Sequence, residues 1–149
     1  MTIVERSLLI RVPPEKVAQV LLDADLAPAW TSGLERFEVV SGRSGEVGCV
    51  GRAHYREGGR DYVLVDVLRD VVPNRYYRSH IDGGGISVDV ETRLDPVEGD
   101  GTRLTLRWSG AGTNPVTRIS LPLMKRRIAS RADVDLRALR DLAEGFGPY

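Results

Sequence analysis

Apolar residues change their spacing twice along the chain, and each change predicts a different kind of element. Residues 2–12 are extended and partly alternating, which predicts a β-strand. Residues 14–25 follow a proline and place apolar side chains on one helical face, which predicts a helix. Residues 26–33 predict a second short helix or turn that Gly33 closes. The N-terminal part of the chain is therefore expected to contain one strand and two short helices.

From residue 34 to residue 110, apolar and polar residues alternate with a period of two. The predicted strands are 34–42, 49–57, 60–70, 75–81, 86–94 and 102–110. Gly58 and Gly59 mark one hairpin turn, and the glycine-rich segment 82–85 marks another. Strands joined by such short turns run antiparallel, because parallel neighbours need a long crossover. The middle of the chain therefore predicts an antiparallel sheet.

A long amphipathic helix is predicted from residue 114 onward. Asn114 is a suitable N-cap, and Pro115 suits the first helical position. Apolar residues then recur at helical spacing, at Val116, Ile119, Leu123, Met124, Ile128, Ala132, Leu136, Leu139 and Ala143. Pro122 lies inside this pattern, where proline removes a hydrogen bond and costs about 3 kcal/mol in a regular helix. We therefore expect a kink at Pro122.

The last two predicted strands separate an apolar face from a polar face. The apolar face carries Ile86, Val88, Val90, Leu104, Leu106 and Trp108. On the polar face we expect weak cross-strand ion pairs of Asp89, Glu91 and Arg93 with Arg103 and Arg107. The apolar face needs a cover, and only the C-terminal helix is long and apolar enough to provide one. The sequence therefore predicts an α+β fold with one long helix on an antiparallel sheet.

Composition limits the function classes without changing this fold. The chain has 149 residues, which favours a single domain over residues 1–149. Its 21 basic and 21 acidic side chains cancel, which argues against nucleic acid or an anionic membrane as the partner. No apolar run is long enough for stable membrane insertion, and the N-terminus lacks the shape of a signal peptide. With one cysteine and hence no internal disulfide, we expect a soluble cytoplasmic protein.

The two histidines, His54 and His80, both lie on predicted strands. Either would suit general acid–base chemistry if it faced a cavity. His54 shares its parity with Arg52 and Arg56, so we expect it to face water. The facing of His80 stays open, because it shares parity with both Arg78 and an aromatic residue. For each histidine an ordinary strand position is the favoured interpretation.

Two charged sets have both a functional and a structural interpretation. Asp66 would be a catalytic acid or a member of a surface ion pair, and a basic run would be a phosphate or nucleic-acid site or a solvated helix face. Asp66 has the opposite parity to the valines of its strand, so we expect it to point outward and to pair with Arg75 or Arg78. The densest basic set lies on the predicted C-terminal helix, at Arg118, Lys125, Arg126, Arg127 and Arg131. A solvated helix face is the favoured interpretation of this set, because the net charge is zero and no aromatic residues are interleaved.

The sequence contains no pattern with metal or phosphate spacing. One cysteine and two separated histidines are too few for a metal site, and we expect Cys49 to be buried and inert. The segment 82–85 lacks the Gly-x-Gly-x-x-Gly spacing of a phosphate loop. Ser44 has no acid and histidine partners in a recognisable order. We therefore expect no metal and no cofactor, and the sequence assigns no catalytic residue.

The aromatic residues offer either pocket walls or ordinary core packing. The set consists of Trp30, Tyr55, Tyr62, Tyr76, Tyr77 and Trp108. In a pocket such side chains place hydroxyl groups or an indole N–H toward a ring-bearing ligand. Trp30 and Trp108 are the strongest pocket candidates, although core packing is the slightly favoured interpretation for Trp108.

Five stretches of the sequence occur in an order shared with a known family. They are VPPEKVAQVLLDADLAPAWTSGLERFEVV (12–40), VGCVGRAHYREGG (47–59), VLRDVVPNRYYRS (67–79), GTRLTLRWSG (101–110) and ADVDLRALRDLAEG (132–145). Family-typical residues within them are Asp23, Trp30, Gly51, Arg52, Pro73 and the segment 139–144. In this order the stretches resemble the START-like (SRPBCC) superfamily with its helix-grip, or Bet v 1-like, fold. The bacterial polyketide cyclase/dehydrase and lipid-transport branch is the most similar.

The resemblance implies a curved antiparallel sheet wrapped around a long C-terminal helix, with two short helices after the first strand. It also implies a cavity between sheet and helix, whose mouth lies near the N-terminal half of that helix. Pro122 would then mark a kink at the mouth, or it would simply fit the curvature of the core. The two interpretations have equal weight.

Three function classes remain open, and we favour a carrier or binder of a small hydrophobic molecule such as a lipid, isoprenoid or polyketide. The sequence supplies apolar residues that can form the wall of a cavity, but it shows no group of acidic and basic side chains that would converge there. The predicted ligand-binding residues are Trp30, Tyr55, Tyr77, Val88, Leu106, Trp108, Ile119 and Leu123.

The first alternative is an aromatase/cyclase-type enzyme, in which inward polar groups orient a polyketone for aldol cyclisation and dehydration. Candidates for such groups are Arg52, Tyr55, Tyr77 and His80. The second alternative is a protein-interaction module on the same fold, which should expose a large apolar patch. The predicted edge strand 34–41 also offers a pairing surface for a homodimer.

Overall fold

A seven-stranded antiparallel sheet forms the body of the molecule in the computed structural model, which describes residues 1–145. The strands are β1 (Thr2–Ile10), β2 (Leu34–Ser41), β3 (Val50–Glu57), β4 (Arg60–Val72), β5 (Tyr76–Gly83), β6 (Ile86–Val97) and β7 (Gly101–Gly112). Their order across the sheet is β1-β7-β6-β5-β4-β3-β2, so β1 and β2 form the two edges. The predicted antiparallel sheet is confirmed, with β1 paired to β7 and the other strands joined to their sequence neighbours.

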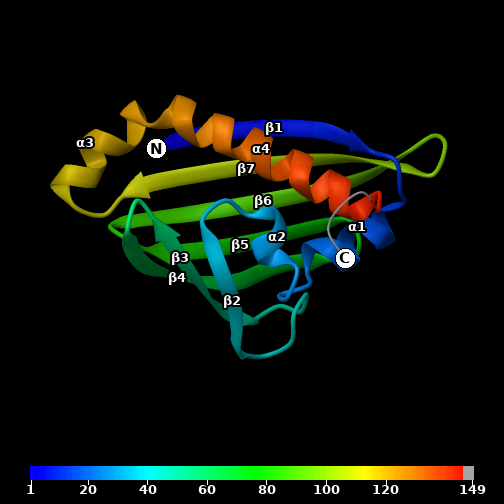
Figure 1. Cartoon of the computed structure of the whole chain (residues 1–149), viewed down its shortest axis with the longest axis horizontal. Coiled ribbons are helices and arrows are strands. Elements are labelled where there is room, and N and C mark those ends of the chain that lie inside the picture. Colours follow the sequence, from blue (N-terminus) through cyan, green and yellow to red (C-terminus); the bar gives the residue numbers. More distant parts are fainter. Residues whose placement is uncertain (146–149) are drawn as a thin grey trace.

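The helices all lie on one side of this sheet. They are α1 (Pro14–Leu21), α2 (Ala27–Trp30), α3 (Pro115–Leu123) and α4 (Lys125–Ala143). Figure 1 shows α4 running lengthwise along the sheet beside β1 and β7, with α3 continuing beyond its N-terminal end. Both α1 and α2 contact α4. The predicted α+β fold, with two short helices after the first strand and a long C-terminal helix on the sheet, is confirmed.

The C-terminal half of α4 packs directly on the sheet and forms the main core. Leu136 and Leu139 of α4 are 2% and 0% exposed, and they join Ile10, Leu94 and Leu104 in one cluster. These strand residues come from β1, β6 and β7, which lie next to one another in the sheet. The apolar spacing of the C-terminal segment therefore marks the helix face that is buried here.

The predicted kink at Pro122 is a break between two helices. Asn114 accepts a hydrogen bond from the Thr117 backbone N–H at 2.9 Å and forms a capping box, which confirms it as the N-cap of α3. Helix α3 contains Pro122 and ends at Leu123, and α4 begins two residues later. Met124 lies between them with φ −93° and ψ 4°, outside regular helical geometry.

The hairpin between β6 and β7 is longer than predicted. The sequence pattern indicated a loop over 95–101, whereas the pairing of Asp95 with Arg103, Pro96 with Thr102 and Val97 with Gly101 extends both strands. The polar residues and the proline in this segment are typical of a loop. They nevertheless belong to the strands, because the pairing of the hairpin continues through them.

The first helix is shorter than predicted and ends at Leu21. Asp23 caps a turn instead, because its side chain accepts a hydrogen bond from the Asp25 N–H at 2.9 Å.

The expected ion pairs between β6 and β7 do not form among the described residues. The register places Glu91 opposite Arg107, but Glu91 accepts a hydrogen bond from the Tyr76 hydroxyl at 2.6 Å. Asp89 contacts His80 at 2.9 Å and Arg78 at 3.5 Å, both on β5. The acidic side chains of β6 therefore lean toward β5, a direction that alternation alone does not determine.

Replacement of a core leucine tests the packing of α4 on the sheet. We expect Leu139→Ala to lower the free energy of unfolding by about 2–5 kcal/mol, because it removes buried methyl groups and leaves a void. Val134 is 50% exposed on the same helix, so Val134→Ala should change it by about 0.5 kcal/mol or less. Urea denaturation of both variants gives the comparison, and equal effects would contradict the assigned helix face.

Candidate functional site

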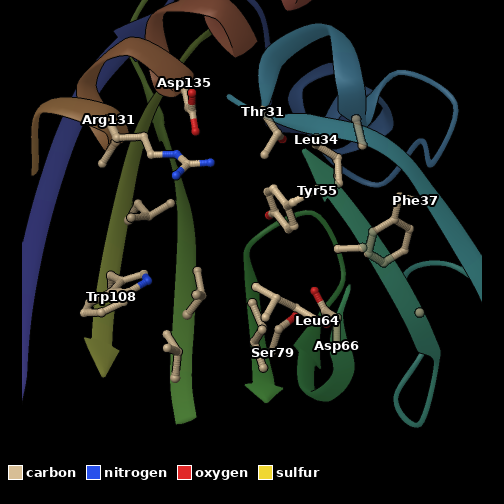
Figure 2. A pocket seen from close by; sticks show the side chains of 18 of the residues that line it. Thr31, Leu34, Phe37, Tyr55, Leu64, Asp66, Ser79, Trp108, Arg131 and Asp135 are labelled. Carbon is tan, nitrogen blue, oxygen red and sulfur yellow. The ribbon is translucent and has the colours of Figure 1, made fainter. Parts of the chain in front are cut away.

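A cavity of about 810 Å³ lies between the inner face of the sheet and the helices. Its volume falls within the usual range for small-molecule sites, about 300–1,000 Å³. Strands β2 to β7 supply most of the wall, and the helices and several loop residues supply the rest. Figure 2 shows side chains from the strands and from α4 facing each other across this space.

Six of the eight predicted ligand-binding residues line this cavity. They are Trp30, Tyr55, Tyr77, Val88, Leu106 and Trp108. The other two, Ile119 and Leu123, do not line it. They lie on the outer side of α3, where they are 71% and 81% exposed. The neighbouring Leu121 is 6% exposed and lines the cavity instead. Helical spacing identified an apolar face on α3, but that face points away from the sheet.

Two glycines make room for aromatic rings on the inner face of the sheet. A Cβ atom at Gly110 would lie 2.4 Å from the ring of Trp108, which folds over this glycine on the same strand. A Cβ atom at Gly51 would lie 2.2 Å from the ring of Phe37 on β2. Both distances are shorter than any real carbon contact, so the two rings require glycine beneath them. Trp108 and Phe37 thereby become flat parts of the cavity wall.

One end of the cavity holds a compact cluster of polar side chains, in which the positive charge of one arginine neutralises part of the acidic charge. Arg131 of α4 forms an ion pair with Glu57 of β3 and donates a hydrogen bond to the Ser32 carbonyl. Ser32 also donates from its backbone N–H to Asp135 at 3.0 Å. The Glu57 carboxylate further accepts a hydrogen bond from the Tyr62 hydroxyl at 2.8 Å. The cluster ties α4 to β3 and to the segment after α2.

Two stacked tyrosines extend this cluster into the cavity. The rings of Tyr55 and Tyr62 lie 5.1 Å apart with an interplanar angle of 8°, and the Arg131 guanidinium lies 5.8 Å from the Tyr55 ring centroid. Burial raises the pKa of Tyr55 to about 12, although the charge of Arg131 acts in the opposite direction. Tyr55 is therefore a neutral hydroxyl at physiological pH.

Asp66 is a second polar group of the cavity, and its position corrects the outward placement expected from the sequence. Figure 2 shows Asp66 beside Ser79, on the same side of the sheet as Leu64. Asp66 does face the opposite side from the valines of its strand, as parity predicts. The valines, however, face solvent rather than the core, since Val63 and Val65 are 44% and 40% exposed. Asp66 consequently faces the cavity and makes no ion pair with the arginines expected to neutralise it.

The environment of Asp66 disfavours its charged form. Burial raises the pKa of the Asp66 carboxyl to about 6, and a hydrogen bond from Ser79 only partly opposes the rise. Burial likewise raises the pKa of Asp135, against its hydrogen bonds with Ser32. The cavity thus contains carboxyl groups that change protonation state closer to neutral pH than exposed carboxyls do.

A family model described as "Polyketide cyclase / dehydrase and lipid transport" matches residues 1–144, almost the whole chain. The chain belongs to this family. Membership implies either the binding of a hydrophobic ligand or a polyketide cyclase role. No curated protein matches the chain.

Solved structures share the fold of this family member at low sequence identity. The Zhui aromatase/cyclase from Streptomyces sp. R1128 is 19% identical with a TM-score of 0.77, over 95% of this chain and 93% of that one. A START superfamily protein from Mycobacterium smegmatis is 13% identical with a TM-score of 0.77, over 97% and 98%. Ara h 8.0201 is 16% identical with a TM-score of 0.75, over 95% and 96%. At these identities the similarity shows the fold alone.

The two histidines of this family member lie outside the cavity wall. His54 faces the polar side of β3, as expected, with its Nε2 atom 3.4 Å from Glu38. His80 contacts Asp89 at 2.9 Å and Asp82 at 3.1 Å. Its side chain, whose direction the sequence left open, therefore points to the same polar side of the sheet. Cys49 is 8% exposed, and burial raises the pKa of its thiol.

Sequence reasoning missed several polar residues of the cavity, among them Arg131, Asp66, Asp135, Glu57 and Ser79. Arg131 was assigned to a solvated helix face, and Asp66 and Asp135 were assigned to no site. A signal was available for α4, since Arg131 and Asp135 follow Ile128 at helical spacing and therefore share its inward side. Trp30 was identified, but its buried indole N–H has no hydrogen-bond partner within residues 1–145.

Two further observations concern membranes and metals. None of the helices in residues 1–145 combines the length and apolar character needed to cross a bilayer. Within the same residues, no three His, Cys, Asp or Glu side chains converge as metal ligands.

The burial of Asp66 predicts a pH-dependent cost to stability. The folded-state pKa of about 6 exceeds the ordinary value of 3.8, so the folded chain holds this proton more tightly than the unfolded chain. Stability is therefore lost as pH rises from about 4 to 6, and it stays lost above that range. Between pH 4 and pH 8, we expect the stability of Asp66→Asn relative to the natural protein to rise by roughly 2 kcal/mol.

Urea denaturation across this pH range provides the measurement. Asp70→Asn is the matched control, because Asp70 lies on the same strand, pairs with Arg78 and does not line the cavity. If the difference in stability between Asp66→Asn and the natural protein does not change with pH, this carboxyl is well hydrated in the folded protein and the prediction is wrong.

Proposed function

We propose that this family member binds and carries a small, mostly apolar molecule in the cavity between the sheet and α4. The cavity of about 810 Å³, walled largely by aliphatic and aromatic side chains, is the observation that carries the proposal. Burial of about 300 Å² of apolar ligand surface contributes roughly 7 kcal/mol, at ~25 cal/mol per Å² and before association costs. A shaped apolar space is therefore sufficient for useful affinity.

The arrangement of the wall supports binding of a ring-bearing or branched molecule. Trp108 and Phe37 present flat ring surfaces over their glycines, and Tyr55 adds a third ring close to α4. Leu106 and Val88 come from the neighbouring strands β7 and β6 and supply aliphatic surface. Aromatic faces on several sides of a cavity favour a ligand that can stack on them.

An aromatase/cyclase-type activity is the second candidate, and Asp66 is the observation that favours it. A cavity carboxyl with a pKa of about 6 exchanges a proton near neutral pH, as aldol cyclisation and dehydration require. The neutral hydroxyl of Tyr55 and the charge of Arg131 could orient the carbonyl oxygens of a polyketone. A mass-spectrometric search for cyclised product from a poly-β-ketone substrate separates this candidate from a carrier, which returns its ligand unchanged.

Truncation of a cavity aromatic tests the binding proposal. We expect Trp108→Ala to raise the Kd for the neutral fluorescent probe N-phenyl-1-naphthylamine about tenfold, because a stacking surface is lost. Fluorescence titration gives the Kd, and circular dichroism verifies that the variant is folded.

Val134→Ala serves as the control in this titration, because Val134 is half exposed on α4 and does not line the cavity. Its Kd should match that of the natural protein. If Trp108→Ala and Trp30→Ala both bind the probe with unchanged affinity while remaining folded, the probe does not occupy this cavity.

A further inference from the structure

Asp66 lies on the cavity wall in apolar surroundings. It belongs to the inward-facing set of β4 together with Leu64 and Leu68, and it lies opposite Gly51 of β3 and Ile81 of β5 in the sheet register. Its hydrogen-bond partner is the hydroxyl of Ser79 on β5. Figure 2 shows the Asp66 and Ser79 side chains together, well separated from Arg131 and Asp135. The two residues form a polar spot on an otherwise apolar part of the wall.

No cation neutralises this carboxylate within residues 1–145. Two titratable groups interact with it, Tyr55 on β3 and Cys49 just before that strand. Burial and, to a smaller extent, the negative charge of Asp66 raise the pKa of both. Of the two arginines that the described part of the chain places in the cavity wall, Arg131 is already paired with Glu57, and Arg60 lies at the start of β4 opposite Glu57 in the register. An isolated charged group in such a place is costly unless another hydrogen-bond donor satisfies it. Ser79 supplies one donor, while a carboxylate has room for several.

We propose that Asp66 and Ser79 form the anchor for a ligand hydroxyl group, so that the cavity selects apolar molecules bearing an alcohol or phenol. The assignment rests on the proposed binding function and adds the chemical class of the ligand. A ligand O–H would donate to the free side of the Asp66 carboxylate, while the rest of the molecule contacts the apolar and aromatic wall. A ligand carboxylate at this spot would instead be repelled by Asp66.

A hydroxyl fits this environment better than an ammonium group does. An ammonium group carries a full charge and directs its three N–H donors apart, so the Asp66–Ser79 pair, which lies on one side of it, cannot satisfy all three. The aliphatic neighbours Leu64, Leu68 and Ile81 offer no further acceptor side chains. A hydroxyl has a single donor, which the free side of the Asp66 carboxylate satisfies, and it brings no charge into these apolar surroundings.

A matched pair of probes tests this anchor in the full chain. The probes are 2-naphthol and 2-methoxynaphthalene, which share their ring system and differ in the hydroxyl donor. By isothermal titration calorimetry at pH 7.5, we expect 2-naphthol to bind about tenfold more tightly. In Asp66→Leu, which removes the acceptor, the two affinities should agree within about twofold. The control Asp70→Asn should keep the full preference, because Asp70 lies on the same strand outside the cavity wall.

A pH series provides a second measurement that does not depend on how well Asp66→Leu folds. Protonation of Asp66 below its pKa of about 6 weakens it as an acceptor, so the preference for 2-naphthol should shrink between pH 7.5 and pH 5. Asp66→Asn should show a smaller preference that does not change over this range. Asp135 also lines the cavity and has a raised pKa, so Asp135→Asn should retain the pH dependence of the natural protein.

The outcomes separate this anchor from the binding function on which it rests. Equal affinities of the natural protein for the two probes would overturn the anchor and leave the hydrophobic cavity in place. A preference for 2-naphthol that persists in Asp66→Leu would also overturn it. Failure of both probes to bind, together with failure of N-phenyl-1-naphthylamine, would overturn the binding function itself.

Discussion

The packing of α4 on the sheet at one end only is the constraint on which the rest of the structure depends. The C-terminal half of the helix buries Leu136 and Leu139 against Ile10, Leu94 and Leu104. Farther toward its N-terminus, the helix lines the cavity through Ile128, Arg131 and other residues. Because hydrophobic burial is concentrated at one end, the other end can keep an empty space without loss of the fold. The break between α3 and α4 lies on this cavity side.

The polar groups of the cavity divide into two kinds with different consequences. Arg131, Glu57 and Ser32 satisfy one another and connect α4 to the strands beneath it, so this cluster has a structural explanation. Within residues 1–145, Ser79 is the one side-chain partner of Asp66, and burial disfavours the charge of this carboxyl. A buried carboxyl of this kind costs stability, and functional sites commonly carry such costs. For this reason Asp66, and not Arg131, is the polar group that we assign to ligand recognition.

The fold of this family is shared by proteins as different in sequence as the Zhui aromatase/cyclase and Ara h 8.0201. Sequence identities of 16–19% to these two leave the side chains of each cavity free to differ. The curved sheet and the long helix create a space, and the residues on its wall decide what enters it. For this chain we propose that the aromatic wall receives a ring-bearing ligand and that the Asp66–Ser79 pair receives its hydroxyl group.

The sequence alone determined the element order, the antiparallel sheet, the helix cap at Asn114 and most of the aromatic wall, because these depend on local spacing and on turn residues. It did not determine which face of β4 or of α3 points inward. The valines of β4 and the apolar residues Ile119 and Leu123 are exposed, while Asp66 faces the cavity, so hydrophobicity alone assigned the wrong side. Only the tertiary structure decided this, because the facing of a strand or helix is set by the register and packing of its neighbours. An internal cavity also allows a polar residue to occupy an inward position that a filled core would exclude.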